Sequence, residues 1–274
     1  MKESKFSLVN LILAAGLLFG GIIMLVPVFW MASTSFKTLA EIFLPNWIPN
    51  PFTLENYQVV LERIPIFRML FNSFFVSIMS TFGQLLTATL AGYAFARIRF
   101  WGKNVIFMLF LGTMMIPSTV IMIPLYLIID TFGLINTYSG LIVPSLVSVF
   151  AIFMLRQFFS TIPKELDESA YIDGASRLRV LFEIIAPLSK PAYGALFIFS
   201  FMGVWNEFLW PLLITTGESM RPIQVGVAYF QLGHTMDFGA TMAASFIASA
   251  PILIVFLIAN RTFVQGITMS GIKG

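Results

Sequence analysis

The sequence predicts an all-α, polytopic membrane protein with six transmembrane helices and a polar helix between spans four and five. Of its 274 residues, 58% are hydrophobic and only 11% are charged, whereas soluble domains carry about 25% charged residues. The apolar residues also come in runs of about 20, the length that a helix needs to cross a bilayer. The strands of a membrane β-barrel would alternate apolar and polar residues, and no such alternation is visible.

Six apolar runs bounded by charge supply the candidate spans. The first follows Lys2 and Lys5 and is longer than the apolar region of a signal peptide, about 7 to 15 residues, so we expect it to be retained as a helix. All six are long enough for helices, and we expect a single transmembrane domain over 1–274. The expected spans are 8–33, 69–96, 105–129, 137–159, 192–215 and 240–259.

The distribution of positive charge predicts the orientation. Six spans place both termini on one side, and that side holds twelve of the 16 Lys and Arg residues. Positive residues near the ends of spans are retained in the cytoplasm. We therefore expect a multi-pass protein of the inner (cytoplasmic) membrane with both termini cytoplasmic. The basic residues are spread over loops rather than gathered in a patch, so they do not indicate nucleic-acid binding.

One polar segment, 160–191, interrupts the apolar sequence and is predicted to lie in the cytoplasm. Pro163 suits the first turn of a helix, and Gly174 can adopt the left-handed conformation that ends it. Ser176 can then cap a second helix. The apolar residues of that second helix recur at i, i+3, i+4 and i+7 on one face: Leu178, Leu181, Phe182 and Ile185. The pattern predicts a short helix on the membrane surface that fits a groove on a cytoplasmic partner.

Within this segment the chain resembles the permease subunits of ABC importers. Their cytoplasmic signature is Glu-Ala-Ala, three residues, Gly, nine residues, Ile, one residue and Leu-Pro. This chain keeps the spacing and departs from the signature at Ser169 and Ala186, where small or apolar residues remain. The matching positions are Glu168, Ser169, Ala170, Gly174, Ile184, Ala186 and Pro187. The extended form ESAYIDGAS, which includes Asp173 and Ala175, is similar to the carbohydrate-uptake branch.

Other segments extend the resemblance over nearly the whole chain. They are NSFFVS at 72–77, LAGYAFARIRFWGK at 90–103, WNEFLWPLL at 205–213 and FVQGITMSGIKG at 263–274. The last is similar to the Gly-rich ending of the second permease subunit in importers of the maltose/oligosaccharide or glycerol-3-phosphate type. The resemblance therefore implies the second permease subunit of such an importer.

The resemblance implies mechanical work on a solute pathway rather than catalysis. This chain has no G-x-x-x-x-G-K-[ST] phosphate loop, so ATP and Mg would be used by other chains and no cofactor is expected here. The implied partners are a second, homologous permease in a heterodimer, two cytoplasmic ABC ATPase subunits and an extracytoplasmic solute-binding protein. The resemblance implies that Glu168 contacts a basic residue of the ATPase. It also implies that Asp173 and Gly174 end the helix and so orient it, and that Ala170 faces the groove of the ATPase. As an alternative, Asp173 only caps the next turn.

The resemblance also assigns the C-terminal tail, 261–274. In the family a similar segment reaches between the ATPase subunits, so Gly266, Gly271 and Lys273 are candidate ATPase contacts. The alternative is a disordered terminus.

Glu207 is the only acidic residue within an expected span. Ionisable groups in a membrane are costly and indicate function. Together with Trp205 and Asn206 it is a candidate for the solute pathway, because aromatic rings and hydrogen-bonding groups suit sugars. The alternative is a buried structural hydrogen bond near the interface between permeases.

Several alternatives stay open on sequence alone. His234 and Asp237 have no ligand spacing with other His or Cys residues, and the chain has no Cys, so no metal site is expected. The solute is a carbohydrate or, alternatively, glycerol 3-phosphate or a glycerophosphodiester. From other classes, an ion-coupled secondary transporter would use carboxylates at the membrane midplane, and a scaffold protein would bind something other than an ATPase through its surface helix.

Overall fold

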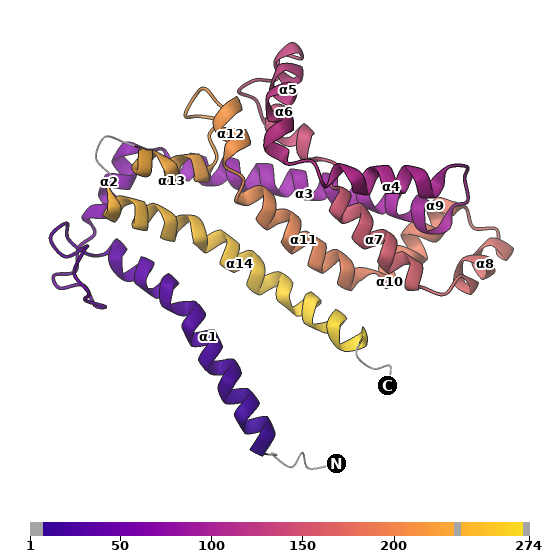
Figure 1. Cartoon of the computed structure of the whole chain (residues 1–274), viewed down its shortest axis with the longest axis horizontal. Coiled ribbons are helices and arrows are strands. Elements are labelled where there is room, and N and C mark those ends of the chain that lie inside the picture. The colour runs from indigo at the N-terminus through magenta and orange to yellow at the C-terminus, as the bar shows by residue number, and fades with distance from the viewer. Residues whose placement is uncertain (1–7, 233–236, 271–274) are drawn as a thin grey trace. The chain divides into compact units, whose positions relative to one another are not determined.

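The structure is a computed structural model that describes residues 8–232 and 237–270 (Figure 1). Every regular element in these residues is helical. The chain divides into two compact units, which are described separately here. The first comprises 1–64 and 226–249, and the second comprises 65–225 and 250–274.

Three helices of the second unit form its central packing. α3 (Ile66–Arg97) contacts α7 (Val149–Thr161) and α11 (Lys190–Trp205) more extensively than any other pair of elements, and Figure 1 shows both running beside it. α3 carries small and polar residues on its buried face, and Gly92 allows α7 to approach so closely that an added Cβ would lie 3.1 Å from Leu155. Small residues of this kind let membrane helices pack backbone against backbone.

The apolar runs are mostly helical, and among the described residues three helices are continuous candidate spans. Residues 10–35, 66–97 and 238–258 form helices that are long and apolar enough to cross a membrane, and three further spans would each require a bent pair of helices. The first bent pair is α4 (Lys103–Thr113) with α5 (Ser118–Thr131), which bends by 97°. The second joins α6 (Tyr138–Ile142) and η1 (Val143–Ser145) to α7 and bends by 43°. The third joins residues 177–188 to α11 and bends by 81°. The expectation of exactly six spans therefore stays a prediction.

The last two expected spans also differ from the structure in their bounds. The span expected at 192–215 is broken, because α11 ends at Trp205 and α12 begins at Leu209 (Leu209–Ile214). The helix expected at 240–259 is longer, since α14 covers Phe238–Ser270. It therefore includes most of the segment that was expected to be a separate tail.

The first unit contains α1 (Leu8–Ser35), α2 (Glu55–Arg63) and parts of α13 (Ile223–Leu232) and α14. The connection between α1 and α2 is held by polar contacts, since the side-chain amide of Asn56 donates to the carbonyl oxygens of Ser35 and Lys37 at 3.0 and 2.8 Å. Arg63 pairs with Asp237 at 3.7 Å, which ties α2 to the residue before α14.

The polar segment between α7 and α11 folds into four short elements. They are α8 (Glu165–Ile172), α9 (Arg177–Val180), the π-helical η2 (Leu181–Ile185) and α10 (Ala186–Leu188). Buried side chains of α8, α9 and η2 join the core of the second unit with those of α3, α7 and α11. This shared core attaches the polar segment to the helices that form the central packing.

Candidate functional site

α8 ends before Gly174, as the sequence predicted, but it begins at Glu165, two residues after Pro163, which was expected in its first turn. Glu165, Asp167 and Glu168 occupy its first turn, where the positive end of the helix dipole favours carboxylates. Gly174 follows the helix with φ +80°, a conformation that glycine adopts at little cost. The amide of Ala175 then donates to the carbonyl oxygen of Ala170 at 2.9 Å, which closes the corner.

The second helix begins as predicted, but its buried face differs. The hydroxyl of Ser176 accepts a hydrogen bond from the Arg179 amide, as expected of an N-cap. Leu181 and Ile185 are fully buried, whereas Leu178 is 60% exposed and Phe182 is 49% exposed. The prediction of one common apolar face is therefore wrong. The physical reason is the π-helical stretch over η2, whose wider turn shifts side chains away from the 3.6-residue period.

Most of the candidate coupling residues lie on the surface of this segment. Glu168, Ser169, Asp173, Gly174 and Pro187 are exposed, and Ala175 is half-buried. Ala170 differs, because it is only 9% exposed and packs in the core with α3 and α7. Its expected position facing a partner's groove is therefore corrected: its small side chain lets α8 lie close to the protein's own core.

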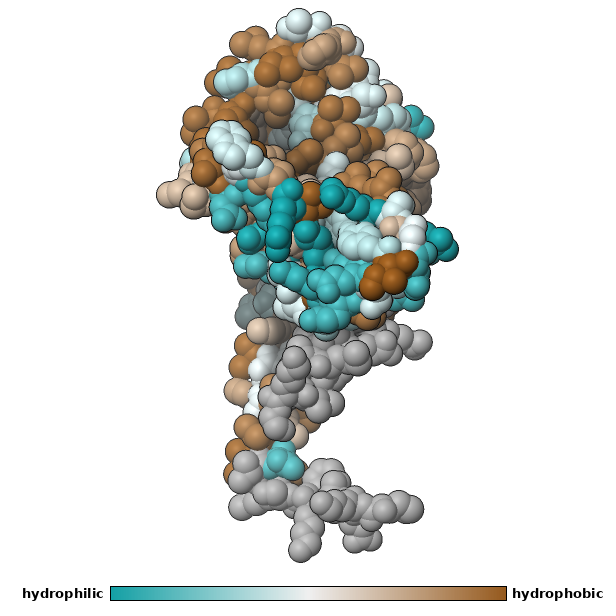
Figure 2. Space-filling model, turned by 90° about the vertical axis from the view of Figure 1, so that its right-hand side faces the viewer, coloured by the Kyte–Doolittle hydropathy of each residue, from teal (hydrophilic) through white to brown (hydrophobic). Residues whose placement is uncertain are grey.

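The exposed surface around these residues mixes charge with large apolar side chains. Ile172 is 86% exposed, and Leu178 and Phe182 lie nearby in sequence on the following helix. Figure 2 faces the side of the second unit that carries α8 and α9, and hydrophilic residues gather there around scattered hydrophobic ones. A surface of this composition suits a protein partner, because contacts of that kind combine apolar anchors with a polar rim.

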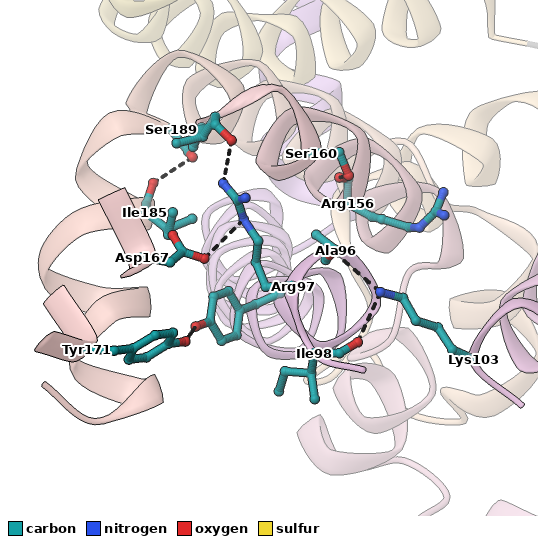
Figure 3. A network of polar contacts seen from close by, with 12 residues as sticks. Ala96, Arg97, Ile98, Lys103, Arg156, Ser160, Asp167, Tyr171, Ile185 and Ser189 are labelled. Carbon is teal, nitrogen blue, oxygen red and sulfur yellow. Dashed lines mark hydrogen bonds and ion pairs between the residues drawn. The ribbon is translucent and has the colours of Figure 1, made fainter. Parts of the chain in front are cut away.

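A buried ion pair joins α8 to α3 (Figure 3). Arg97 Nε lies 3.5 Å from Asp167 Oδ2, and the two side chains are 3% and 8% exposed. Arg97 also donates from Nη2 to the carbonyl oxygen of Ile162 at 2.7 Å. Within the described part of the chain, Asp167 Oδ1 has no hydrogen-bond partner. Burial raises the pKa of Asp167, although the neighbouring Arg97 guanidinium lowers it.

Three further contacts fix the same end of α3. Lys103 donates to the carbonyl oxygens of Ala96 and Ile98 at 3.4 and 3.0 Å, and Arg156 donates to that of Phe95 at 3.4 Å. Cations at a helix C-terminus satisfy its free carbonyl groups and oppose its dipole. Tyr93 on α3 also shares a 3.2 Å hydrogen bond with Tyr171 on α8. Sequence analysis used Lys103 and Arg156 only as topology signals, but the structure shows that they bind the end of α3, and that the Tyr93–Tyr171 contact joins α3 to α8.

The three candidate residues of the tail lie at the limit of the described chain. Gly266 falls within α14, whereas Gly271 and Lys273 lie outside the described residues. Their assignment as ATPase contacts stays a prediction.

The three candidate pathway residues separate in the structure. Trp205 is 1% exposed and stacks on Phe201 with the ring centroids 5.6 Å apart, so it belongs to the core, and its expected place on a pathway is corrected. Asn206 and Glu207 are exposed at the break between α11 and α12. Glu207 Oε1 accepts a hydrogen bond from the Trp210 amide at 3.3 Å, and Asn206 Oδ1 accepts one from Gln224.

Glu207 lines a cavity of about 360 Å³ in the second unit. Sequence analysis missed the other polar residues of its lining, although each stands out as a hydroxyl or amide within an apolar run. They are Ser73, Gln84, Ser145, Ser148 and Ser200. Within the described part of the chain, no three or more His, Cys, Asp or Glu residues group as metal ligands would, and His234 lies outside it.

Comparisons with known proteins show that the sequence of this chain is similar to those of transport proteins. The family model described as "Binding-protein-dependent transport system inner membrane component" matches residues 84–269. The chain is 31% identical to the arabinooligosaccharides transport system permease protein AraQ of Bacillus subtilis (strain 168), over 98% of each chain. It is 33% identical to the sn-glycerol-3-phosphate transport system permease protein UgpE of Shigella flexneri serotype 5b (strain 8401), over 93% of this chain and 94% of the relative.

A solved structure shares the fold. A chain of a bacterial ABC transporter involved in the import of the acidic polysaccharide alginate superposes with a TM-score of 0.80, at 21% identity, over 96% of this chain and 99% of that chain. At this identity the likeness concerns the fold alone.

Proposed function

The chain belongs to the family of binding-protein-dependent transport system inner membrane components, and on this premise we propose that it is the second permease subunit of an ATP-driven carbohydrate importer. In this proposal it forms half of a transmembrane pathway with a homologous permease. Two cytoplasmic ABC ATPases use ATP and Mg, and an extracytoplasmic protein delivers the solute. The chain itself performs no catalysis. The name of the AraQ relative supports a carbohydrate, and that of the UgpE relative keeps glycerol 3-phosphate as the alternative.

The observation that carries the coupling role is the way α8 is held. Its outer face presents Glu168 and Asp173 to solvent, while its inner face is fastened by Ala170 in the core and by the Asp167–Arg97 pair. A force applied to the outer face would pass directly to α3, because α8 cannot move without breaking a buried charge pair. α3 would pass it to α7 and α11, which pack along it.

The contact surface supports an ATPase as the source of that force. Glu168 is an exposed carboxylate on a helix that also presents Ile172, which is 86% exposed. A basic residue in a partner's groove would pair with Glu168 while the apolar side chain fills the groove. Gly266, Gly271 and Lys273 would add a second contact between the ATPase subunits.

The test is charge reversal at Glu168 in the complete transporter. The chain is co-expressed with its genomic neighbours, and ATPase association and ATP-dependent uptake into proteoliposomes are measured for Glu168→Lys. We expect uptake to fall at least about tenfold while the protein stays folded, because a desolvated charge contact that turns repulsive costs several kcal/mol. Glu62→Lys, on the exposed surface of α2, is the matched control and should transport normally.

The outcomes separate this proposal from its rivals. If no ATPase associates and uptake collapses with an ion gradient rather than with ATP depletion, the chain is a secondary transporter. If an ATPase associates but Glu168→Lys transports normally, the coupling assignment is wrong. The solute itself is identified by the compound that raises the melting temperature of the neighbouring binding protein.

A further inference from the structure

The cavity at the break between α11 and α12 has a lining unlike that of ordinary helix packing. Its polar side chains come from three parts of the second unit: Ser73 and Gln84 on α3, Ser145 and Ser148 around η1 and the start of α7, and Ser200 and Glu207 on and after α11. Its volume of about 360 Å³ lies within the range of small-molecule sites, about 300 to 1,000 Å³.

The charge of the lining has a single sign. Among the described residues that line the cavity, Glu207 is the only ionisable one. Its position is fixed, because Oε1 accepts the Trp210 amide and the Trp210 indole donates to the carbonyl oxygen of Gly140 at 3.1 Å. A carboxylate has lone pairs beyond the one used here. It therefore keeps acceptor capacity for a hydroxyl group in the cavity.

The hydroxyl groups also keep hydrogen-bonding capacity. Ser148 accepts the Ala151 amide at 3.2 Å as the cap of α7, which leaves its O–H as a donor. Phe150 and Phe199, which are 41% and 55% exposed, line the cavity edge to face with their ring centroids 6.4 Å apart. Apolar ring faces beside fixed donors and acceptors fit the C–H faces and hydroxyl groups of a sugar.

From this geometry we infer that the cavity is a solute-contact site supplied by this chain, selective for neutral polyhydroxylated solutes and closed to anionic ones by the Glu207 carboxylate. The inference rests on the proposed importer function. A carboxylate in a cleft with low-dielectric walls focuses a negative potential, which lowers the local concentration of anions. A phosphate or carboxylate solute would need an Arg or Lys partner, and none of the described lining residues supplies one.

The electrostatic potential in the cavity can be measured with a single introduced thiol, because the chain has no cysteine of its own. Ser200→Cys changes one atom of the lining and places a thiol in the cavity. In vesicles that hold the complete transporter, we compare how fast a cationic and an anionic methanethiosulfonate reagent block this thiol. A maleimide polymer then reacts with the thiols that remain free, and the gel shift of this chain measures their fraction. We expect the cation to react faster. The rate ratio should fall at least about fivefold in Glu207→Gln, because local ion concentrations follow the focused potential.

Two controls isolate the cavity. Glu218→Gln removes an exposed carboxylate that does not line it and should leave the ratio at Ser200→Cys unchanged. Ser160→Cys places the thiol on the exposed end of α7, where Glu207→Gln should have no effect. Equal rates for the two reagents, or no reaction at Ser200→Cys from either side of the membrane, would overturn the inference.

Protection by solutes tests the selectivity itself. Neutral trisaccharides of glucose and arabinose should slow the labelling of Ser200→Cys, while glycerol 3-phosphate and an oligouronate at equal concentration should not. Protection by the anions, or by none of the neutral sugars, contradicts the site. ATP-dependent uptake in the same vesicles distinguishes a failure of the proposed function from a failure of this inference. If no ATPase associates, the proposed function is wrong. If uptake is normal but the labelling rates do not change in Glu207→Gln, only this inference is wrong.

Discussion

At the scale of single residues, Asp167 predicts a specific dependence of stability on pH. Burial raises its pKa above the ordinary value of 3.8. An acid with a raised pKa stabilises the fold below its ordinary pKa, and that contribution is lost as pH rises through the folded value. Asp167→Asn stays neutral at every pH. The melting temperature of the wild-type transporter minus that of the variant should therefore decrease from acidic to neutral pH. A difference that grows with pH would show that the attraction of Arg97 outweighs burial and lowers the pKa of Asp167.

Gly174 predicts a cost that arises from backbone conformation alone. Its φ is +80°, and an added Cβ would meet no atom within 4 Å. A β-branched residue in the left-handed region costs about 1–2 kcal/mol, whereas Asn tolerates that region better. Gly174→Val should thus shift α8 and uncouple ATP hydrolysis from uptake, while Gly174→Asn should retain most coupling. The solute transported per ATP measures this, and equal coupling in both variants would contradict the role of the corner.

At the scale of elements, the junction of α8 with α3 predicts a non-additive mutant cycle. Asp167→Leu leaves the Arg97 guanidinium buried without its partner, and breaking a buried pair costs about 3–5 kcal/mol. Adding Arg97→Met removes that stranded charge, although the bond to the Ile162 carbonyl is also lost. The double variant should therefore unfold at a higher temperature than Asp167→Leu alone.

The exposed pair on the next helix supplies the control for this cycle. Arg179 and Glu183 lie 2.8 Å apart, but their side chains are 63% and 60% exposed. Because solvent screens a pair this exposed, the corresponding cycle should be additive within error. Additive effects at Arg97 and Asp167 as well would show that the buried pair is not a junction.

The same elements show what sequence could and could not predict. The end of α8 followed from Gly174, because turns are local properties of the chain, whereas Pro163 lies two residues before the helix rather than in its first turn. The buried face of the next helix did not follow, since a π-helical stretch has no reliable sequence signal. Ala170 and Trp205 turned inward because their surroundings are set by distant segments. The cavity combines side chains from α3 to Pro222, and only tertiary packing brings them together.

At the scale of the whole molecule, the charge distribution and the proposed coupling role predict the same orientation. The proposal needs α8 in the cytoplasm, and the bias of Lys and Arg independently predicts that position. With six spans, this orientation predicts that the loop after α12 faces the opposite side. In that loop, the amide of Thr216 donates to the Asn136 side chain at 3.2 Å, while the rest of Thr216 is exposed.

This orientation is testable because the chain has no cysteine of its own. Ser169→Cys and Thr216→Cys each place one exposed thiol in α8 and in the loop after α12, respectively. A membrane-impermeant maleimide should label Ser169→Cys in inside-out vesicles and Thr216→Cys in right-side-out vesicles, since a charged reagent cannot cross the bilayer. The unsubstituted chain should remain unlabelled in both. Labelling of Ser169→Cys in right-side-out vesicles only would place α8 outside the cytoplasm, where no ATP-driven partner could act on it, and would contradict the importer proposal at its base.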